Sequence, residues 1–388
     1  MEDELWDEVQ DEVTGADLRE VDVLVVGAGQ AGLATAHWLQ TVPGLRVLVV
    51  DGAPVGQSWR DRWDSLQLFT PRHFSSLPGL RFPSGRSRSP SRLEMADYLQ
   101  RYVAHFALPV QTGVRVDRLT RDGDRFTACT TTGATTGTVL ARHVVLASGP
   151  FHRPFVPAAG DGLHPDVDQR HSYDYRRPSD LPPGDVLVVG GGNSAAQLAV
   201  ELEATHRVTV ASPGPLWYLP ADVLKISVYW WLYVGRVLNA SADAWISRYI
   251  RRRGDSIVGT ELRELVRRGR VTLHPHRVVA GDDRAVTLED QTVLPVSSVL
   301  WCTGFRPDTS WIDVAGAVDG DGEPVHRAGA SPVPGLHWMG LPWQTRLNSS
   351  IIDGADRDAR AVAARVASAE GLPAPQARTR SSLSPRMT

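Results

Sequence analysis

Cysteine is scarce in this 388-residue chain, which contains only Cys129 and Cys302. The two lie far apart and form neither a CxxC pair nor a cluster with metal-ligand spacing, so the sequence predicts no metal site and no redox dithiol. The net charge is also small, at −3, which gives no indication of a nucleic-acid partner or of an acidic substrate. These absences indicate an ordinary soluble enzyme, and a reduced, cytoplasmic setting is the expectation.

Long hydrophobic runs are missing as well. No segment approaches the roughly 18 apolar residues of a membrane span, so no span is expected. Residues 1–20 are acidic and lack the apolar core of a signal peptide, and we expect a solvated arm or a short helix there. Residues 371–388 are rich in Pro, Ser and Arg and are expected to be disordered.

A glycine-rich turn lies between an apolar run and a helical pattern at residues 21–32, VDVLVVGAGQAG. Its spacing is GxGxxG. Gly27 permits the sharp bend, Gly29 lets a pyrophosphate approach the backbone, and Gly32 lets the helix pack closely on the strand. The helix N-terminus adds free N–H groups and a partial positive charge. This context favours a dinucleotide site over a purely structural glycine turn.

The next apolar run, residues 46–50, ends at Asp51, which is 19 residues beyond Gly32. A carboxylate at that position can accept hydrogen bonds from ribose hydroxyls. Residues 55–72 follow and mix aromatic and arginine side chains. We interpret this segment as a cover over the cofactor rather than as a loop whose aromatic side chains only fill gaps. The reason is that loops at the carboxyl edge of a strand lie at the ligand crevice.

A second copy of the motif, DVLVVGGGNSAAQL, begins at residue 185 and places Gly190, Gly192 and Ala195 at the three small-residue positions. Two such units indicate two dinucleotides. The strand after this copy, residues 207–211, is followed by Ser212 rather than an acidic residue. A carboxylate there normally marks NAD, so its absence favours NADPH without excluding NADH.

Residues 216–257 are dense in aromatic side chains and end near three consecutive arginines, residues 251–253. The favoured interpretation is an insertion helix buried in a subunit or domain interface. A substrate lid and a grip on the NADP phosphate are the alternatives. The arginines are candidates for that grip only if the segment folds back over the second motif.

Several further elements follow from periodicity. Apolar spacing predicts a helix over residues 91–106, and residues 110–147 indicate a small antiparallel insertion with a return strand. Residues 297–301 are expected to lead the chain back to the first domain, and residues 336–341 to form a final strand. A last helix is expected over residues 349–369, with a dipole suited to the pyrimidine edge of a reduced flavin.

Six segments, in order, resemble the bacterial flavin-containing monooxygenase branch of the two-dinucleotide flavoproteins: GAGQAGLA with Asp51, GQSWRDRWDSLQLFTPRHFSSLPG, VVLASGPFHRPFVP, VVGGGNSAAQLA, WCTGFRPD and GLHWMGLPWQ. The resemblance covers about residues 21–370. It implies FAD on the first motif, NADPH on the second, and a discontinuous FAD domain that closes around an inserted nucleotide domain.

The resemblance has departures. The family motif FxGxxxHxxxY aligns on His171 and Tyr175, but Pro165 and Val167 replace its Phe and Gly. The Baeyer–Villiger variant ends in Trp-Pro, which is absent here, so ketone oxidation ranks second. The family's arginine after the second nucleotide strand is replaced by Ser212, and its active-site asparagine has no counterpart that we can place.

The expected fold is therefore α/β with two Rossmann-like dinucleotide-binding domains, the second inserted into the first. Residues 21–155 and 300–370 are assigned to FAD, and residues 156–299 to NAD(P), with the aromatic insertion at 216–257. No catalytic residue is assigned. The positions expected at the cofactors are Gly27, Gly29, Gln30, Gly32, Asp51, Gly56, Trp59, Val116, Ala147, Gly149, Gly190, Gly192, Asn193, Ser194, Ser212, Thr303, Gly304, Ser349 and Ser350.

The electrons that nicotinamide gives to a flavin must leave it again. Cys129 and Cys302 cannot form the dithiol that glutathione-reductase-like flavoproteins use, so dioxygen or a diffusible acceptor remains. We expect a monooxygenase that transfers one oxygen atom from O2 to a small nucleophilic substrate, an amine, sulfide or indole-like carbon, through a flavin C4a-hydroperoxide. An NAD(P)H:acceptor oxidoreductase, Baeyer–Villiger oxidation and a non-enzymatic flavoprotein regulator are the alternatives. A homodimer is compatible with the sequence.

Overall fold

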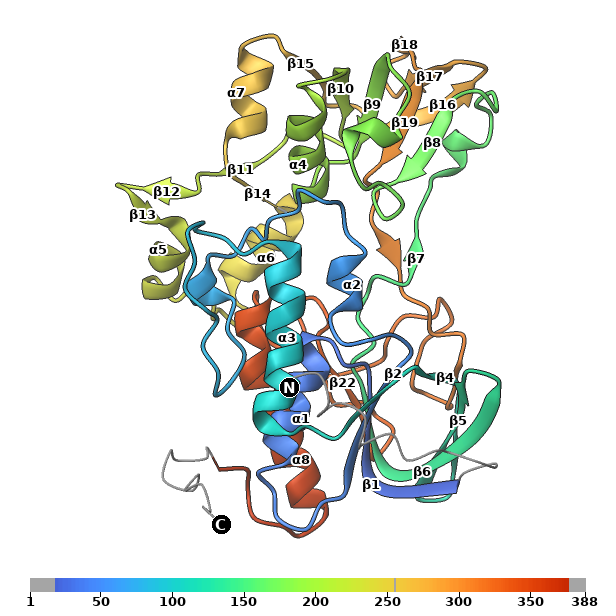
Figure 1. Cartoon of the computed structure of the whole chain (residues 1–388), viewed down its shortest axis with the longest axis vertical. Helices are drawn as coiled ribbons and strands as arrows, with labels where there is room; N and C mark the ends of the chain where they lie inside the picture. The colour runs from blue at the N-terminus through green and yellow to red at the C-terminus, as the bar shows by residue number, and fades with distance from the viewer. Residues whose placement is uncertain (1–17, 255, 377–388) are drawn as a thin grey trace, which may run out of the picture.

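The computed structural model describes residues 18–254 and 256–376 (Figure 1). Most of the expected acidic arm and most of the expected disordered tail lie outside these residues. The arm is shorter than expected, because the first strand, β1 (Leu18–Val26), begins at Leu18. Its residues 18–20 pair in parallel with residues 138–140, so they belong to the sheet.

The first unit, in the lower part of Figure 1, is built on an eight-stranded sheet. Its strands run in the order β21 (Ile312–Asp313), β4 (Val114–Asp122), β5 (Arg125–Thr132), β6 (Thr135–Leu146), β1, β2 (Val47–Asp51) and β3 (Val110–Thr112), and β22 (Leu336–Trp338) pairs with β6. β1 is parallel to β2 and β6, whereas β4, β5 and β6 form an antiparallel meander. The predicted insertion and its return strand are thus confirmed.

Three helices cover one face of this sheet: α1 (Gln30–Leu39), α3 (Arg92–Phe106) and α8 (Ala355–Ala369). Side chains of β1 alternate between the two faces, so Val23 and Val25 pack with these helices while Leu24 packs against the meander. The predicted helix over residues 91–106 is confirmed. Two short elements, α2 (Gln57–Arg60) and η1 (Arg72–Phe74), lie between β2 and α3.

The second unit, in the upper part of Figure 1, has a five-stranded parallel sheet. Its order is β15 (Val271–His274), β10 (Arg207–Ala211), β9 (Asp185–Val189), β19 (Ser298–Trp301) and β8 (Asp168–His171). Helices α4 (Asn193–Leu202) and α7 (Glu261–Arg267) pack on one face, and the antiparallel strands β16 (Val278–Asp282), β17 (Ala285–Leu288) and β18 (Val293–Pro295) cover the other. The chain passes between the units twice, along the antiparallel pair β7 (Arg153–Pro154) and β20 (Phe305–Arg306). The turns η2 (Ala158–Gly160) and η3 (Pro178–Asp180) flank β8.

The aromatic segment forms β11 (Tyr218–Leu219), the hairpin β12 (Asp222–Val223) and β13 (Ile226–Ser227), α5 (Val228–Val234), α6 (Trp245–Arg253) and β14 (Ile257–Val258). Within the chain, the expected helix buried in a domain interface is not present, and burial in a subunit interface stays a prediction. α5 buries only Val228 and Tyr229, which pack on Phe74 of the first unit, and α6 buries only Ser247. Most of the other aromatic side chains, such as Trp231 and Trp245, are exposed, whereas Trp217 and Tyr218 are half-buried.

The C-terminal elements differ from expectation at their ends. α8 begins at Ala355, not at Ser349, because the Ser349 hydroxyl accepts the backbone N–H groups of Thr345 and Arg346, both at 3.0 Å, and holds a turn. A short 3-10 helix, η4 (Ile352–Gly354), then leads into α8. β22 ends at Trp338, before the left-handed Gly340. Among the described residues, no helix is long and apolar enough to cross a membrane.

Candidate functional site

The first glycine turn leaves one open position. A Cβ on Gly27, whose φ is +108°, would lie 2.4 Å from the carbonyl oxygen of Ala147, and a Cβ on Gly32 would lie 1.9 Å from the Gly27 oxygen. Packing therefore requires both glycines. A Cβ on Gly29 would meet nothing within 4 Å, so the backbone at the N-terminus of α1 faces free space. This cradle fits the pyrophosphate of a dinucleotide.

Asp51 ends β2 beside this turn. Its two carboxylate oxygens accept the backbone N–H groups of Ala28 at 2.7 Å and Ala53 at 2.9 Å. Each oxygen keeps a second lone pair, and the two bonds fix the carboxylate in place. The residue therefore fits the ribose-binding role that its position predicts.

The other positions expected near FAD are spread around the turn. Gly56 has φ +83° and packs so tightly that a Cβ would lie 2.8 Å from the Cα of Ala96. Trp59 packs against the core that contains α1 and α3, and Val116 lies in the cluster on the opposite face of the sheet, which also contains Val50. Gly149, two residues after Ala147, has open space around its Cβ position.

The C-terminal segment lies against the first turn. The Gln30 amide donates to the Ser350 carbonyl at 3.3 Å, and a Cβ on Gly340 would touch the Cβ of Ala31 at 2.8 Å. The structure thus brings Ser350 to the predicted site. The hydroxyl of the neighbouring Ser349 is occupied by the turn at residues 345–346.

Asp353 is a residue that the sequence reasoning missed. One of its oxygens accepts the Asn348 amide at 3.1 Å, and the other is buried with no hydrogen-bond partner among the described residues. Burial raises the pKa of Asp353 to about 6. The only sequence signal was an acidic residue between the apolar Ile352 and Gly354, which does not by itself indicate burial.

The second glycine turn repeats the geometry of the first. A Cβ on Gly190, with φ +150°, would lie 2.4 Å from the Cys302 carbonyl oxygen, whereas a Cβ on Gly192 would meet nothing within 4 Å. Asn193, the first residue of α4, donates its amide to the Ser256 carbonyl at 3.0 Å and accepts the Val258 N–H at 2.9 Å. The end of the aromatic segment therefore folds back over this turn.

Ser212 and the three arginines at residues 251–253 are relevant to whether the second turn binds NADPH or NADH. Ser212 is buried, and its hydroxyl donates to the Gly214 carbonyl at 2.6 Å. Arg253 lies 5.3 Å from the ring of Trp217, whose carbonyl accepts the Ile257 N–H at 2.9 Å. Arg253 is therefore the arginine held over the loop that follows Ser212. Arg251 instead stacks on Trp343 at 4.8 Å, and Arg252 is exposed.

The remaining expected cofactor positions, Ser194, Thr303 and Gly304, differ in their burial and hydrogen-bond partners. Ser194 lies half-buried in the first turn of α4. The Thr303 hydroxyl donates to the Phe155 carbonyl, and the Gly304 carbonyl pairs with His171 at 3.0 Å. Both residues thus hold the two crossing segments together.

Arg62 lies where the two units meet. Its guanidinium is 5.0 Å from the ring of Phe151, 5.6 Å from that of Tyr173 and 5.2 Å from that of Phe305. Burial lowers the pKa of Arg62. These rings come from three different connecting segments, so this cation links the first unit to both crossings.

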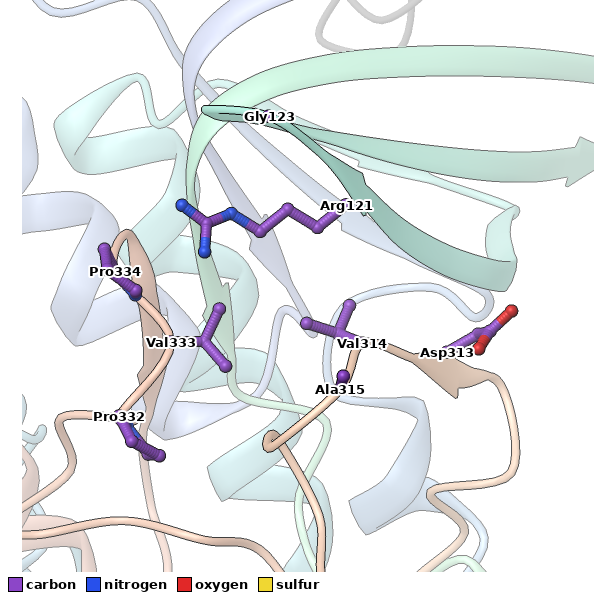
Figure 2. A pocket seen from close by; sticks show the side chains of 8 residues that line it. All are labelled: Arg121, Gly123, Asp313, Val314, Ala315, Pro332, Val333 and Pro334. Carbon is purple, nitrogen blue, oxygen red and sulfur yellow. The ribbon is translucent and has the colours of Figure 1, made fainter.

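Two cavities in the described part of the chain bear on the site. Figure 2 shows the residues that line one of them, of about 390 Å³, between β4 and residues 332–334; none of these residues belongs to the two glycine turns at residues 27–32 and 190–195. The other, of about 450 Å³, lies between residues 65–71, α4 and the aromatic segment. Glu201 lines it, accepts the Tyr175 hydroxyl at 3.1 Å, and has its pKa raised by burial.

Among residues 18–254 and 256–376, the two cysteines are not paired and no metal-ligating cluster forms. No group of three or more His, Cys, Asp or Glu side chains is placed to hold a metal ion there. Both cysteines are free, and burial raises the pKa of Cys302 to about 12, which keeps it an inert thiol at neutral pH.

Comparisons with known proteins agree with this geometry. The family described as "Pyridine nucleotide-disulphide oxidoreductase" matches residues 24–233. An oxidoreductase named CzcO-like from Geobacillus kaustophilus is 38% identical over 340 residues, which cover 87% of this chain and 96% of that protein. CzcO of Bacillus subtilis is 36% identical over 338 residues, with 87% of this chain and 96% of that protein covered.

A solved structure gives the same result. The flavin-containing monooxygenase from Stenotrophomonas maltophilia is 27% identical, has a TM-score of 0.75, and matches 90% of this chain and 99% of its own. The present chain therefore belongs to the pyridine nucleotide-disulphide oxidoreductase family, as an enzyme of its flavin monooxygenase-like branch, which implies FAD and a nicotinamide cofactor.

Proposed function

We propose that this enzyme inserts one oxygen atom of O2 into a small nucleophilic substrate, an amine, a sulfide or an indole-like carbon, at the expense of NADPH. The observation that carries the proposal is the pair of open glycines, Gly29 and Gly192, each at the N-terminus of a helix on a separate sheet. FAD held at the first would supply hydride acceptance and oxygen activation. Residues 21–155 and 302–370 are assigned to FAD and residues 156–301 to NADPH, because β19 (Ser298–Trp301) is a strand of the second sheet and moves the expected boundary from 299 to 301.

The two cysteines support electron transfer to a diffusible acceptor, of which dioxygen is one. Cys129 lies on β5 of the first unit and Cys302 follows β19 of the second, so they cannot pair without unfolding either sheet. Electrons must therefore leave to a diffusible acceptor. The chain's own tasks are to bind both nucleotides, to orient them across the junction and to exclude water there.

The nicotinamide preference is proposed from Arg253. No acidic residue follows β10, and the Ser212 hydroxyl is already used, so the charge for a 2′-phosphate would come from Arg253 beside Trp217. Arg253→Gln should lower the rate of flavin reduction by NADPH about tenfold, and that by NADH little, in stopped-flow measurements. Arg252→Gln, a neighbour with no such ring contact, is the matched control. A tenfold preference of the unaltered enzyme for NADH would contradict the assignment.

The reaction type is tested by isotope incorporation. The holoenzyme, NADPH and ¹⁸O2 are incubated with panels of amines, sulfides, indoles and ketones, and products are analysed by mass spectrometry. A gain of one labelled oxygen is expected in the first three classes. NADPH oxidation with transfer of electrons to an added acceptor, and no labelled product, would instead identify an NAD(P)H:acceptor oxidoreductase. Label in an ester made from a ketone would identify Baeyer–Villiger chemistry.

A further inference from the structure

The projection formed by residues 222–253, here called the docking face, carries more than half of the exposed large hydrophobic side chains of the described residues. They include Leu224, Trp231, Val234 and Trp245, of which Leu224 is 81% exposed and Val234 and Trp245 are each 73% exposed. β12 and β13 lie at the outer edge of the molecule in Figure 1, with α5 below them. A concentration of this kind marks an interaction surface.

The tip of the β12–β13 hairpin has an unusual backbone. Leu224 and Lys225 both have positive φ, 53° and 63°, in a two-residue turn that favours Asn and Gly. A positive φ is unfavourable for leucine, and the exposed Leu224 side chain contacts little of the rest of the chain. The position therefore presents an apolar group to something outside the chain.

Cations accompany the apolar groups. On α6, Trp245, Arg248, Tyr249 and Arg252 recur at helical spacing and are all exposed, so one face of the helix combines aromatic rings with guanidinium groups. Lys225 at the hairpin tip and Arg236 after α5 are exposed as well. Asp243 is the one exposed carboxylate of the docking face without an ion pair, because Asp222 pairs with Arg88.

We propose that the docking face seats the enzyme on an anionic lipid surface. Trp, Tyr and Leu side chains would enter the interfacial layer, and Lys and Arg would contact the lipid phosphates, which is the chemistry of surface-bound amphipathic segments. The charge pattern favours this occupant over a second copy of the chain. A second copy would bring another face with the same excess of cations, Lys225, Arg236, Arg248 and Arg252, into the contact, whereas lipid phosphates would neutralise them.

The test is co-sedimentation of the full-length holoenzyme with two kinds of vesicle, phosphatidylcholine alone and a three-to-one mixture of phosphatidylcholine with phosphatidylglycerol. Binding is expected to the mixture, to weaken with salt, and to be absent with phosphatidylcholine. The apolar variant combines Leu224→Asn, which suits the positive φ, with Trp245→Gln, and should bind about tenfold more weakly. Arg248→Gln and Arg252→Gln should each cost about fivefold.

Val293→Ser is the matched control, because Val293 is 61% exposed on β18, outside the docking face, and should leave binding unchanged. Bound flavin and the melting temperature verify that each variant is folded. Equal binding of the apolar variant and the unaltered enzyme would overturn the proposal, as would no sedimentation with the mixed vesicles. A dimer in sedimentation velocity that the apolar variant converts to monomer, without vesicle binding, would assign the face to a second copy.

Discussion

The glycines of the first turn differ in what a side chain would meet, and this makes the FAD assignment testable at single residues. Gly29→Asp adds a carboxylate in open space, so the fold should survive while a pyrophosphate is repelled. Purified Gly29→Asp should lack flavin absorbance and keep its circular dichroism spectrum. Gly192→Asp should retain FAD but show no flavin reduction by NADPH. A yellow Gly29→Asp protein with full flavin content would contradict the assignment.

Gly32→Ala provides the contrasting case. Its Cβ would lie 1.9 Å from the Gly27 oxygen, so the backbone must shift to admit it. We expect a loss of several kcal/mol of stability, in the upper range for single substitutions, seen as a lower urea midpoint. A melting profile like that of Gly29→Asp would show that the tight packing of α1 on β1 is not needed.

Asp353 predicts a pH dependence of stability. Its pKa in the folded chain, about 6, lies above the ordinary 3.8, so the folded state holds a proton that the unfolded state releases. The stabilisation is complete below about pH 4 and falls as the pH rises through 6, by up to about 3 kcal/mol. Urea titrations of the holoenzyme at pH 4.5 and pH 7 would measure it. Asp353→Asn should flatten that difference, and an unchanged slope would contradict the prediction.

For single residues, the sequence predicted those positions that motif spacing and backbone conformation determine. Gly27, Gly32 and Asp51 could be placed because a strand, a turn and a helix leave few alternatives. Asp353 could not, since its burial depends on segments distant in the chain. Ser212 was expected at the second nucleotide, but the bond from its hydroxyl to the Gly214 carbonyl is a local detail that composition does not encode.

Among the elements, α3 shows how a start signal fixes a boundary. The Ser91 hydroxyl accepts the Glu94 N–H at 3.3 Å, and the Glu94 carboxylate accepts the Ser91 N–H at 2.8 Å, which forms a capping box. Ser91→Ala should lower the unfolding free energy by about 1 kcal/mol, as measured by urea denaturation. Ser84→Ala, in the exposed loop before the helix, should change it little. Equal effects of the two changes would argue against the cap.

Element boundaries were predicted well where an apolar run or a helix cap marks them, as in β10 and α3. The start of α8 was misplaced because the Ser349 hydroxyl stabilises a turn. A serine in such a turn cannot be told from a serine at the start of a helix by sequence alone. The expected burial of the aromatic segment in a domain interface was wrong for a related reason. Aromatic content usually indicates burial, yet nothing in a sequence says whether a neighbouring element covers a ring.

For the whole molecule, two dinucleotide units could be predicted because the motif occurs twice, but their junction could not. Arg62 joins the units through the rings of Phe151, Tyr173 and Phe305. Arg62→Met should keep FAD, slow flavin reduction by NADPH several-fold and expose the crossings to limited proteolysis, since cation–ring contacts are worth about 0.5 to 2 kcal/mol each. Arg207→Met, which alters an exposed pair with Asp185, is the control. Unchanged reduction and proteolysis would remove Arg62 from this role.

The cavity of about 450 Å³ has walls supplied by residues 65–71, by α4 and by the base of the docking face, which are anchored in different parts of the molecule. A change in the angle between the units would therefore change its size. A small-molecule guest bound there would act as a spacer, and the same angle would set how well the second nucleotide reaches the first. Thermodynamic reciprocity then requires that guest and nucleotide alter each other's dissociation constants by one common factor.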